Sequence, residues 1–154
     1  MNRPVLSARI TRTFVQRIHA AAEDVFPLLC PEREKEWLPG WDARMIHSAC
    51  GIAERGAVFE ARDAVWIVTE YDPPRRIAFA RWQPDRILVH IEISLGRHVD
   101  GDTAVCIAYT STPTDEASGA ILAASQPGEW LDTMAFWEGS MNAWFARSRV
   151  GNAP

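Results

Sequence analysis

The sequence has no uninterrupted apolar run of about 20 residues, the length that a membrane-spanning helix needs. Its first residues, MNRPVLSARI, also lack the long apolar stretch of a secretory signal peptide. We therefore expect no membrane span and a cytoplasmic location.

Concentrated positive charge is missing as well. The chain carries 16 Lys and Arg against 20 Asp and Glu, a net charge of −4, and its pI is near 5.5. Its arginines are interleaved with acidic residues along the chain. Because proteins that bind nucleic acid neutralise phosphates with a concentrated basic face, the composition argues against a nucleic-acid partner.

The sequence has few cysteines, and their spacing matches no disulfide or metal-binding motif. The three cysteines are odd in number and widely spaced, with no CxxC motif and no histidine at metal-ligand spacing. We expect Cys30, Cys50 and Cys106 to be free thiols that pack as small apolar core residues in a reducing compartment. The histidines His19, His47 and His98 are isolated along the chain, so we predict no metal site.

Signature motifs of catalysis are absent too. The chain has no GxSxG, no HExxH, no Walker loop and no glycine-rich dinucleotide fingerprint, and we predict no cofactor. Repeats, low-complexity tracts and Gly/Ser linkers are also lacking. A length of 154 residues then predicts one domain over 1–154, with its core at about 8–148.

The patterns that are present predict one strand, two short helices, six more strands and a long helix. Residues 8–19 are rich in β-branched side chains, and 20–30 and 31–38 have short-helix signals. The remaining strands are predicted at 44–49, 56–62, 64–71, 76–82, 86–95 and 102–112. The spacing of Trp130, Met134, Trp137, Met141 and Trp144 places one stripe on a C-terminal helix, and Phe136 and Phe145 broaden its flank. This is an α+β arrangement in which a seven-stranded antiparallel sheet grips a long helix.

Hairpin register predicts which side chains face inward. Pairing Tyr71 with Arg76 across the DPPR turn sets Glu70 opposite Ile77, and Trp66 opposite Arg81. A three-residue loop at 99–101, with Gly101 left-handed, sets Ile91 opposite Tyr109. The inner face then comprises Trp66, Val68, Ile77, Phe79, Val89, Ile91, Ile93, Val105, Ile107 and Tyr109. The reverse face carries Leu88, His90, Glu92 and Ser94.

The segment EKEWLPGW holds two tryptophans around a turn. Pro39 and Gly40 end the second short helix, so Trp37 and Trp41 come from a helix end and a loop. Two interpretations stay open: the indoles plug one end of the core, or they line the mouth of a hollow.

Four stretches resemble the START/polyketide-cyclase-like superfamily, also called SRPBCC: a first strand followed by AEDVFPLLC, then WLPGW, then VTEYDPPRRIAF, and VDGDTAVCIAYTSTP before the long helix. VTEYDPPRRIAF is similar to bacterial members in particular. The resemblance spans roughly 8–148. It implies a helix-grip fold with an apolar cavity between the sheet and the C-terminal helix, its entrance framed by Trp37 and Trp41.

Each candidate site residue has two interpretations. Met134, Trp137 and Met141 form ordinary core or line the cavity. The Tyr109 hydroxyl anchors a ligand or bonds a buried backbone group. Arg81 and Glu70 make polar contacts within the cavity, or they reach solvent at strand ends, which is the favoured interpretation. His90 and Glu92 are either an acid–base pair or, as favoured, a solvated surface pair.

Three functions remain open. The first is binding of a small hydrophobic or amphipathic ligand of lipid, polyketide or aromatic type in the cavity. The second is a cyclase or dehydratase that uses Tyr109, Arg81 or Glu70 as weak catalytic candidates. The third is a protein-interaction or chaperone-regulator role, including a homodimer through the partly apolar reverse face around Val65, Ile67 and Trp82.

Overall fold

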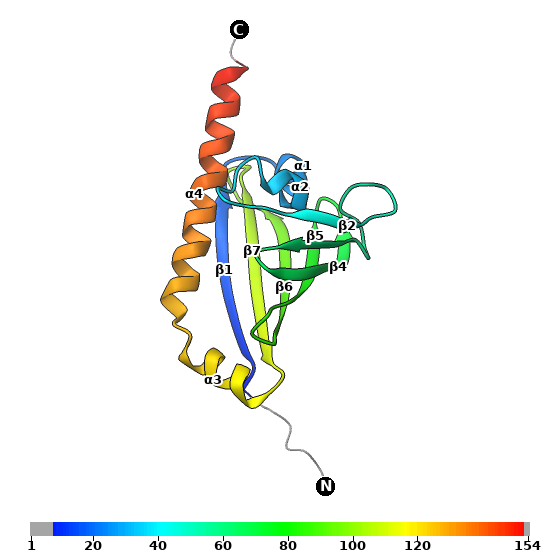
Figure 1. Ribbon diagram of the computed structural model, residues 1–154. Helices are drawn as coiled ribbons and strands as arrows, with labels where there is room; N and C mark the ends of the chain where they lie inside the picture. The colour runs from blue at the N-terminus through cyan, green and yellow to red at the C-terminus, as the bar shows by residue number, and fades with distance from the viewer. Residues whose placement is uncertain (1–7, 153–154) are drawn as a thin grey trace.

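A computed structural model describes residues 8–152 and contains a seven-stranded antiparallel sheet in the order β1-β7-β6-β5-β4-β3-β2. The strands are β1 (Ile10–Ile18), β2 (Arg44–His47), β3 (Val58–Ala61), β4 (Ala64–Asp72), β5 (Arg76–Trp82), β6 (Ile87–Arg97) and β7 (Thr103–Pro113). The short α1 (Ala22–Val25), the 3₁₀ helix η1 (Phe26–Leu29) and α2 (Pro31–Glu34) follow β1. The predicted number of strands, their order and the two short helical segments are confirmed (Figure 1).

The β6–β7 hairpin has the predicted register. Ile91 lies opposite Tyr109, Ile93 opposite Ile107, and Leu95 opposite Val105. Gly101 adopts the left-handed conformation, with φ +83°, that the tight turn requires. The alternation of apolar and polar residues along β6 was therefore sufficient to identify its inner face.

The β4–β5 hairpin agrees with the prediction only in its far half. Val68 lies opposite Phe79 and Trp66 opposite Arg81, as expected, but a bulge between Val68 and Glu70 shifts the rest. Glu70 therefore lies opposite Ala78 rather than Ile77. The prediction that set Glu70 beside the inner face is wrong, because one extra residue in a strand reverses every later side chain.

The two tryptophans of WLPGW close one end of the core. Trp37 and Trp41 are 6% and 8% exposed, so both are buried. Each indole N–H donates to a backbone carbonyl, Trp37 to Leu28 at 2.7 Å and Trp41 to Pro31 at 2.8 Å. Because both donors are satisfied within the protein, the contacts favour the interpretation that these indoles plug the core.

Two helices follow the sheet where one was predicted. α3 (Glu116–Ala124) begins with a capping box in which Asp115 accepts from the Ser118 N–H at 2.8 Å. α4 (Pro127–Gly151) starts after a short break. The predicted helix rested on the spacing of Trp130 to Trp144, which does not extend to the residues of α3.

α4 lies along β1, and its last turns extend past the end of the sheet (Figure 1). Its side chains hydrogen-bond the free edge of β1: Asn142 Nδ2 donates to the Arg17 carbonyl at 2.9 Å, and Asn142 Oδ1 accepts from the His19 N–H at 2.9 Å. Inside, Gln16 Nε2 donates to the Met134 carbonyl at 2.9 Å. The helix thus covers an otherwise unpaired strand edge while its stripe reaches the core.

The cysteine prediction is partly wrong. Cys30, Cys50 and Cys106 are all free thiols, as expected, but Cys50 and Cys106 are exposed and only Cys30 is half-buried. Cys106 lies on β7 at a position that alternates with Val105 and Ile107, so the pleat turns it to the outer face. Within residues 8–152 no helix combines the length and apolarity that crossing a bilayer takes.

The stripe of α4 gives a direct test of its packing. Met141 is 1% exposed, whereas Leu131 on the same helix is 43% exposed. We expect Met141→Ala to lower the free energy of unfolding by about 2–5 kcal/mol, because it leaves a cavity in the core. The matched Leu131→Ala is expected to cost about 0.5 kcal/mol. Urea unfolding followed by circular dichroism measures both, and equal losses would contradict this packing.

Candidate functional site

The predicted inner face is buried, and an aromatic cluster fills its centre. Phe59 stacks on Trp66 with ring centroids 5.4 Å apart, and Phe79 meets both rings edge-on at 6.0 Å. Trp41 contacts Trp66 edge-on at 5.7 Å. Such pairs add about 0.5–1.5 kcal/mol each beyond their area burial. The inner face over β3, β4 and β5 is therefore densely packed.

Little space remains beneath this aromatic cluster. The inner crevice, as we call it, has a volume of about 20 Å³, room for one or two waters at most. Its lining is Glu34, Trp41, Phe59, Trp66, Phe79, Ile91, Ile93, Tyr109 and Trp137. The central hollow implied by the resemblance is thus nearly closed here, because the aromatic side chains occupy it.

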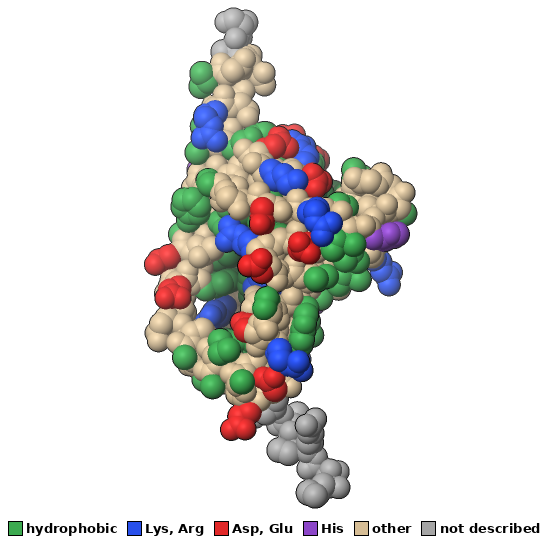
Figure 2. Space-filling view, in the orientation of Figure 1, with side chains coloured by type: hydrophobic (Ala, Val, Ile, Leu, Met, Phe, Trp, Pro, Cys, Tyr) green, Lys and Arg blue, Asp and Glu red, His purple; other side chains and the backbone are tan. Residues whose placement is uncertain are grey.

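A larger opening, the corner pocket, lies between the sheet and the α3–α4 corner. It has a volume of about 210 Å³. Its lining is Arg12, Arg81, Gln83, Asp85, Ile87, Val89, Tyr109, Ser111, Ile121, Leu122, Ser125 and Trp130. Figure 2 shows the surface hollowed between α4 and the sheet. Tyr109 borders both this pocket and the inner crevice.

Arg81 turns inward, against the favoured expectation that it reaches solvent. Its Cζ lies 4.9 Å from the ring centroid of Trp66 and 5.7 Å from that of Tyr109. Among residues 8–152, its Nε is enclosed without a hydrogen-bond acceptor. Burial lowers the pKa of Arg81 from its usual value, and the charge of Asp85 partly opposes that shift. The prediction of a solvated Arg81 is wrong because the register sets it opposite Trp66, where the ring faces attract the cation.

Two neighbouring polar groups share the pocket with Arg81. The ring of Trp130 lies 5.3 Å from that of Tyr109, and its indole N–H is buried without a partner in the described chain. Burial raises the pKa of Tyr109 to about 12, although the charge of Arg81 acts in the opposite direction. At neutral pH the Tyr109 phenol is therefore protonated and can donate a hydrogen bond.

Glu34 is a site residue that the sequence analysis missed. It is half-buried on α2 and lines the inner crevice, where loss of hydration raises the pKa of its carboxyl well above the usual value. Only the charge of Arg62 opposes this shift. A signal was available: Glu34 precedes the buried Trp37 and Leu38 by three and four residues, so the three share one helical face.

The remaining acidic candidates lie outside the core. Arg76 bonds Glu70 at 2.7 Å and Glu92 at 2.6 Å, and His90 lies 3.9 Å from Glu92. All four side chains belong to the outer face of the sheet, where the favoured interpretation set His90 and Glu92. Glu70 is thus part of a surface ion-pair network rather than of either cavity.

The other predicted lining residues divide into three groups. Trp41, Trp66, Phe79, Ile91, Ile93, Tyr109 and Trp137 line the inner crevice, and Val89 joins Tyr109 in the corner pocket. Trp37, Val68, Val105, Ile107, Met134 and Met141 are buried but line neither space, so they are core. Within residues 8–152 no group of three or more His, Cys, Asp or Glu is arranged to hold a metal ion.

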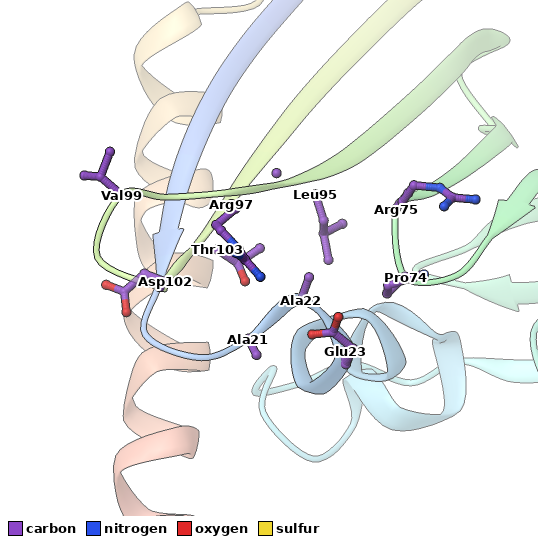
Figure 3. Close-up of a pocket in the computed structure, with 12 residues that line it drawn as sticks. Ala21, Ala22, Glu23, Pro74, Arg75, Leu95, Arg97, Val99, Asp102 and Thr103 are labelled. Carbon is purple, nitrogen blue, oxygen red and sulfur yellow. The ribbon is translucent and has the colours of Figure 1, made fainter.

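An open groove of about 470 Å³ lies at the opposite end, between α1 and the β4–β5 and β6–β7 turns (Figure 3). Two of its four charged residues are paired with residues outside the lining. Arg75 pairs with Asp72 at 3.0 Å and extends away from the groove, and Asp102 pairs with Arg17 at 2.9 Å. No enclosed, unpartnered polar atom belongs to its lining in the described chain. The corner pocket is therefore the stronger candidate site.

The raised pKa of Glu34 predicts that this residue destabilises the folded state increasingly as the pH rises. Below pH 4.5 its carboxyl is protonated in both states, but as the pH rises through that value the unfolded state ionises first and gains stability. We expect Glu34→Gln to leave Tm unchanged near pH 4 and to raise it by about 2 °C or more at pH 7. Differential scanning calorimetry across this range measures the difference.

The matched control is Glu36→Gln on the same segment. Glu36 bonds Arg33 at 2.7 Å, which lowers its pKa, so its replacement is expected to lower Tm slightly at pH 7. If Glu34→Gln also lowers Tm at pH 7, the crevice does not disfavour the charged carboxylate.

Comparison with known proteins places the fold. No protein-family profile matches the sequence, and no curated protein is similar to it. Among solved structures, Ara h 8.0201 superposes with a TM-score of 0.65 at 11% identity, over 88% of this chain and 97% of that one. A hypothetical protein from Helicobacter pylori gives 0.68 at 14% identity, over 88% and 86%. CalU16 from Micromonospora echinospora gives 0.56 at 16% identity, over 94% and 92%. The chain therefore shares the helix-grip fold of these structures.

Proposed function

We propose that this protein binds a small amphipathic molecule in the corner pocket. The observation that carries the proposal is that apolar side chains and two buried hydrogen-bond donors line the same pocket, and neither donor has an acceptor in the part of the chain that the structure describes. Ile87, Val89 and Leu122 supply the walls, and Arg81 and Trp130 supply the donors. Mostly apolar lining with a few well-placed polar groups is typical of small-molecule sites.

The pocket limits the size of the guest. Its volume of about 210 Å³ is below the range of about 300–1,000 Å³ that holds drug-sized ligands. The adjoining inner crevice adds only about 20 Å³. A single aromatic system or a short aliphatic chain suits this space, whereas a long lipid does not fit without rearrangement.

A cyclase or dehydratase activity is the second candidate. Tyr109 supports it, because its protonated phenol borders both spaces and lies beside Arg81. Together these groups could polarise a carbonyl, while the carboxyl of Glu34, whose pKa is raised by loss of hydration, borders the crevice. Glu70 no longer belongs to this hypothesis, since it lies on the outer face.

Ser111 offers a way to test the binding proposal. Its side chain lines the corner pocket opposite Val89, so Ser111→Phe should fill the space. We expect small aromatic and medium-chain ligands to raise the wild-type Tm, and Ser111→Phe to abolish at least nine tenths of that rise. Thermal-shift assays and native mass spectrometry provide the measurements.

Thr110→Phe is the matched control. Thr110 neighbours Ser111 in the same strand but faces outward, where its hydroxyl lies 3.1 Å from that of Thr11. Its replacement should leave ligand binding intact. If Ser111→Phe binds the same ligands as well as the wild type does, the corner pocket is not the site.

A homodimer stays a further prediction. Val65, Ile67, Trp82 and Leu88 are between 41% and 48% exposed on the outer face. We expect Trp82→Glu to reduce the dimer fraction measured by size-exclusion chromatography with light scattering, because it introduces a charge into an apolar patch. A wild-type protein that stays monomeric at high concentration would contradict self-association.

The three free thiols support a reducing compartment such as the cytoplasm.

A further inference from the structure

We infer that the ligand of the corner pocket is a monocarboxylate whose anionic head binds Arg81. This inference rests on the proposed function and narrows its ligand class. It begins from the charges within the pocket lining: two arginines, Arg12 and Arg81, and one carboxylate, Asp85.

Among residues 8–152 neither arginine has an acidic partner. Within that range Arg12 donates only to the Ser125 hydroxyl at 3.0 Å and the Ser125 carbonyl at 3.4 Å. Arg81 has no ion pair in the described chain, and its contacts are the faces of Trp66 and Tyr109. Cation–π contacts offset part of the cost of burying a guanidinium, but they accept none of its in-plane N–H groups.

Asp85 does not accept hydrogen bonds from either arginine, because its oxygens already accept from other groups. They accept from the Ile87 N–H at 3.1 Å and from Gln83 Nε2 at 3.2 Å. Asp85 also sets an upper limit on ligand charge. With two cations and one anion the lining carries a net charge of +1, so a monoanion neutralises it, whereas a doubly charged phosphate would leave the site with a net charge of −1.

A carboxylate fits the donor geometry. A guanidinium presents parallel N–H groups that match the two oxygens of a carboxylate. Trp130, whose indole N–H has no partner in the described chain, has its ring 5.3 Å from that of Tyr109, and apolar walls remain for the body of the ligand. The chemistry is therefore that of a small aromatic or short-chain carboxylic acid.

Matched pairs of acids and amides test the inference without any mutation. The probes are benzoate with benzamide, 1-naphthoate with 1-naphthamide, and octanoate with octanamide, each titrated calorimetrically into the wild-type protein at pH 7. In at least one pair we expect the acid to bind at least about tenfold more tightly than its neutral amide. Equal affinities within every pair would overturn the inference while leaving the proposed function standing.

Variants then assign the preference to Arg81. Arg81→Gln should weaken binding of the acid by about tenfold or more and that of the amide by less than about threefold. Arg44→Gln, an exposed arginine of β2, is the control and should change neither. Thermal melts check folding. Arg81→Lys keeps the positive charge but not the pair of parallel N–H groups, so its loss of acid affinity should be intermediate.

The outcomes separate the two proposals. Retained acid binding in Arg81→Gln overturns the anchoring role. If amides bind, Ser111→Phe blocks them and acids show no preference, the pocket binds ligands but not through an anion site. If no acid or amide binds the wild type in calorimetry and no compound raises its Tm, both proposals fall.

Discussion

The half-buried guanidinium of Arg81 contacts two aromatic rings where the filled part of the interior meets the open corner. Arg81 lies on β5, opposite Trp66 of β4, and it also contacts the face of Tyr109 on β7. A buried cation is costly unless it is paired. Here the ring faces compensate part of that cost and fix the side chain at the boundary between a packed centre and an open corner. The aromatic cluster on one side leaves about 20 Å³, whereas the space on the other side is about tenfold larger.

The position of α4 explains why the opening lies at the corner. The helix hydrogen-bonds the free edge of β1 through Asn142, and so it lies beside the sheet rather than over its middle. α3 then turns the chain back toward β7, and the break before Pro127 leaves Trp130 facing Tyr109. A continuous helix from α3 into α4 could not wrap this corner. The corner pocket is thus a consequence of how the edge strand is satisfied.

Most of the fold was readable from the residues. Period-two alternation along β6 and β7 identified the inner side chains, and the spacing of Met134 and Met141 identified the buried stripe of α4. One prediction failed at a local irregularity: the bulge near Glu70 moved that residue to the outer face. Another failed where residue type was preferred to pattern: Cys106 was expected in the core as a small apolar residue, but the regular alternation that buries Val105 exposes it. Glu34 was missed because it lies in a run of charged residues, which is typical of a solvent-exposed helix face.

The sequence by itself determined the order of the elements, the register of the β6–β7 hairpin and the identity of most buried side chains, since these depend on local periodicity and turn chemistry. Only the tertiary structure decided whether the space between the layers is filled, which arginine is enclosed and where the opening lies. These features depend on side-chain volumes and contacts between strands distant in sequence. Such contacts leave no trace in the spacing of residues along the chain.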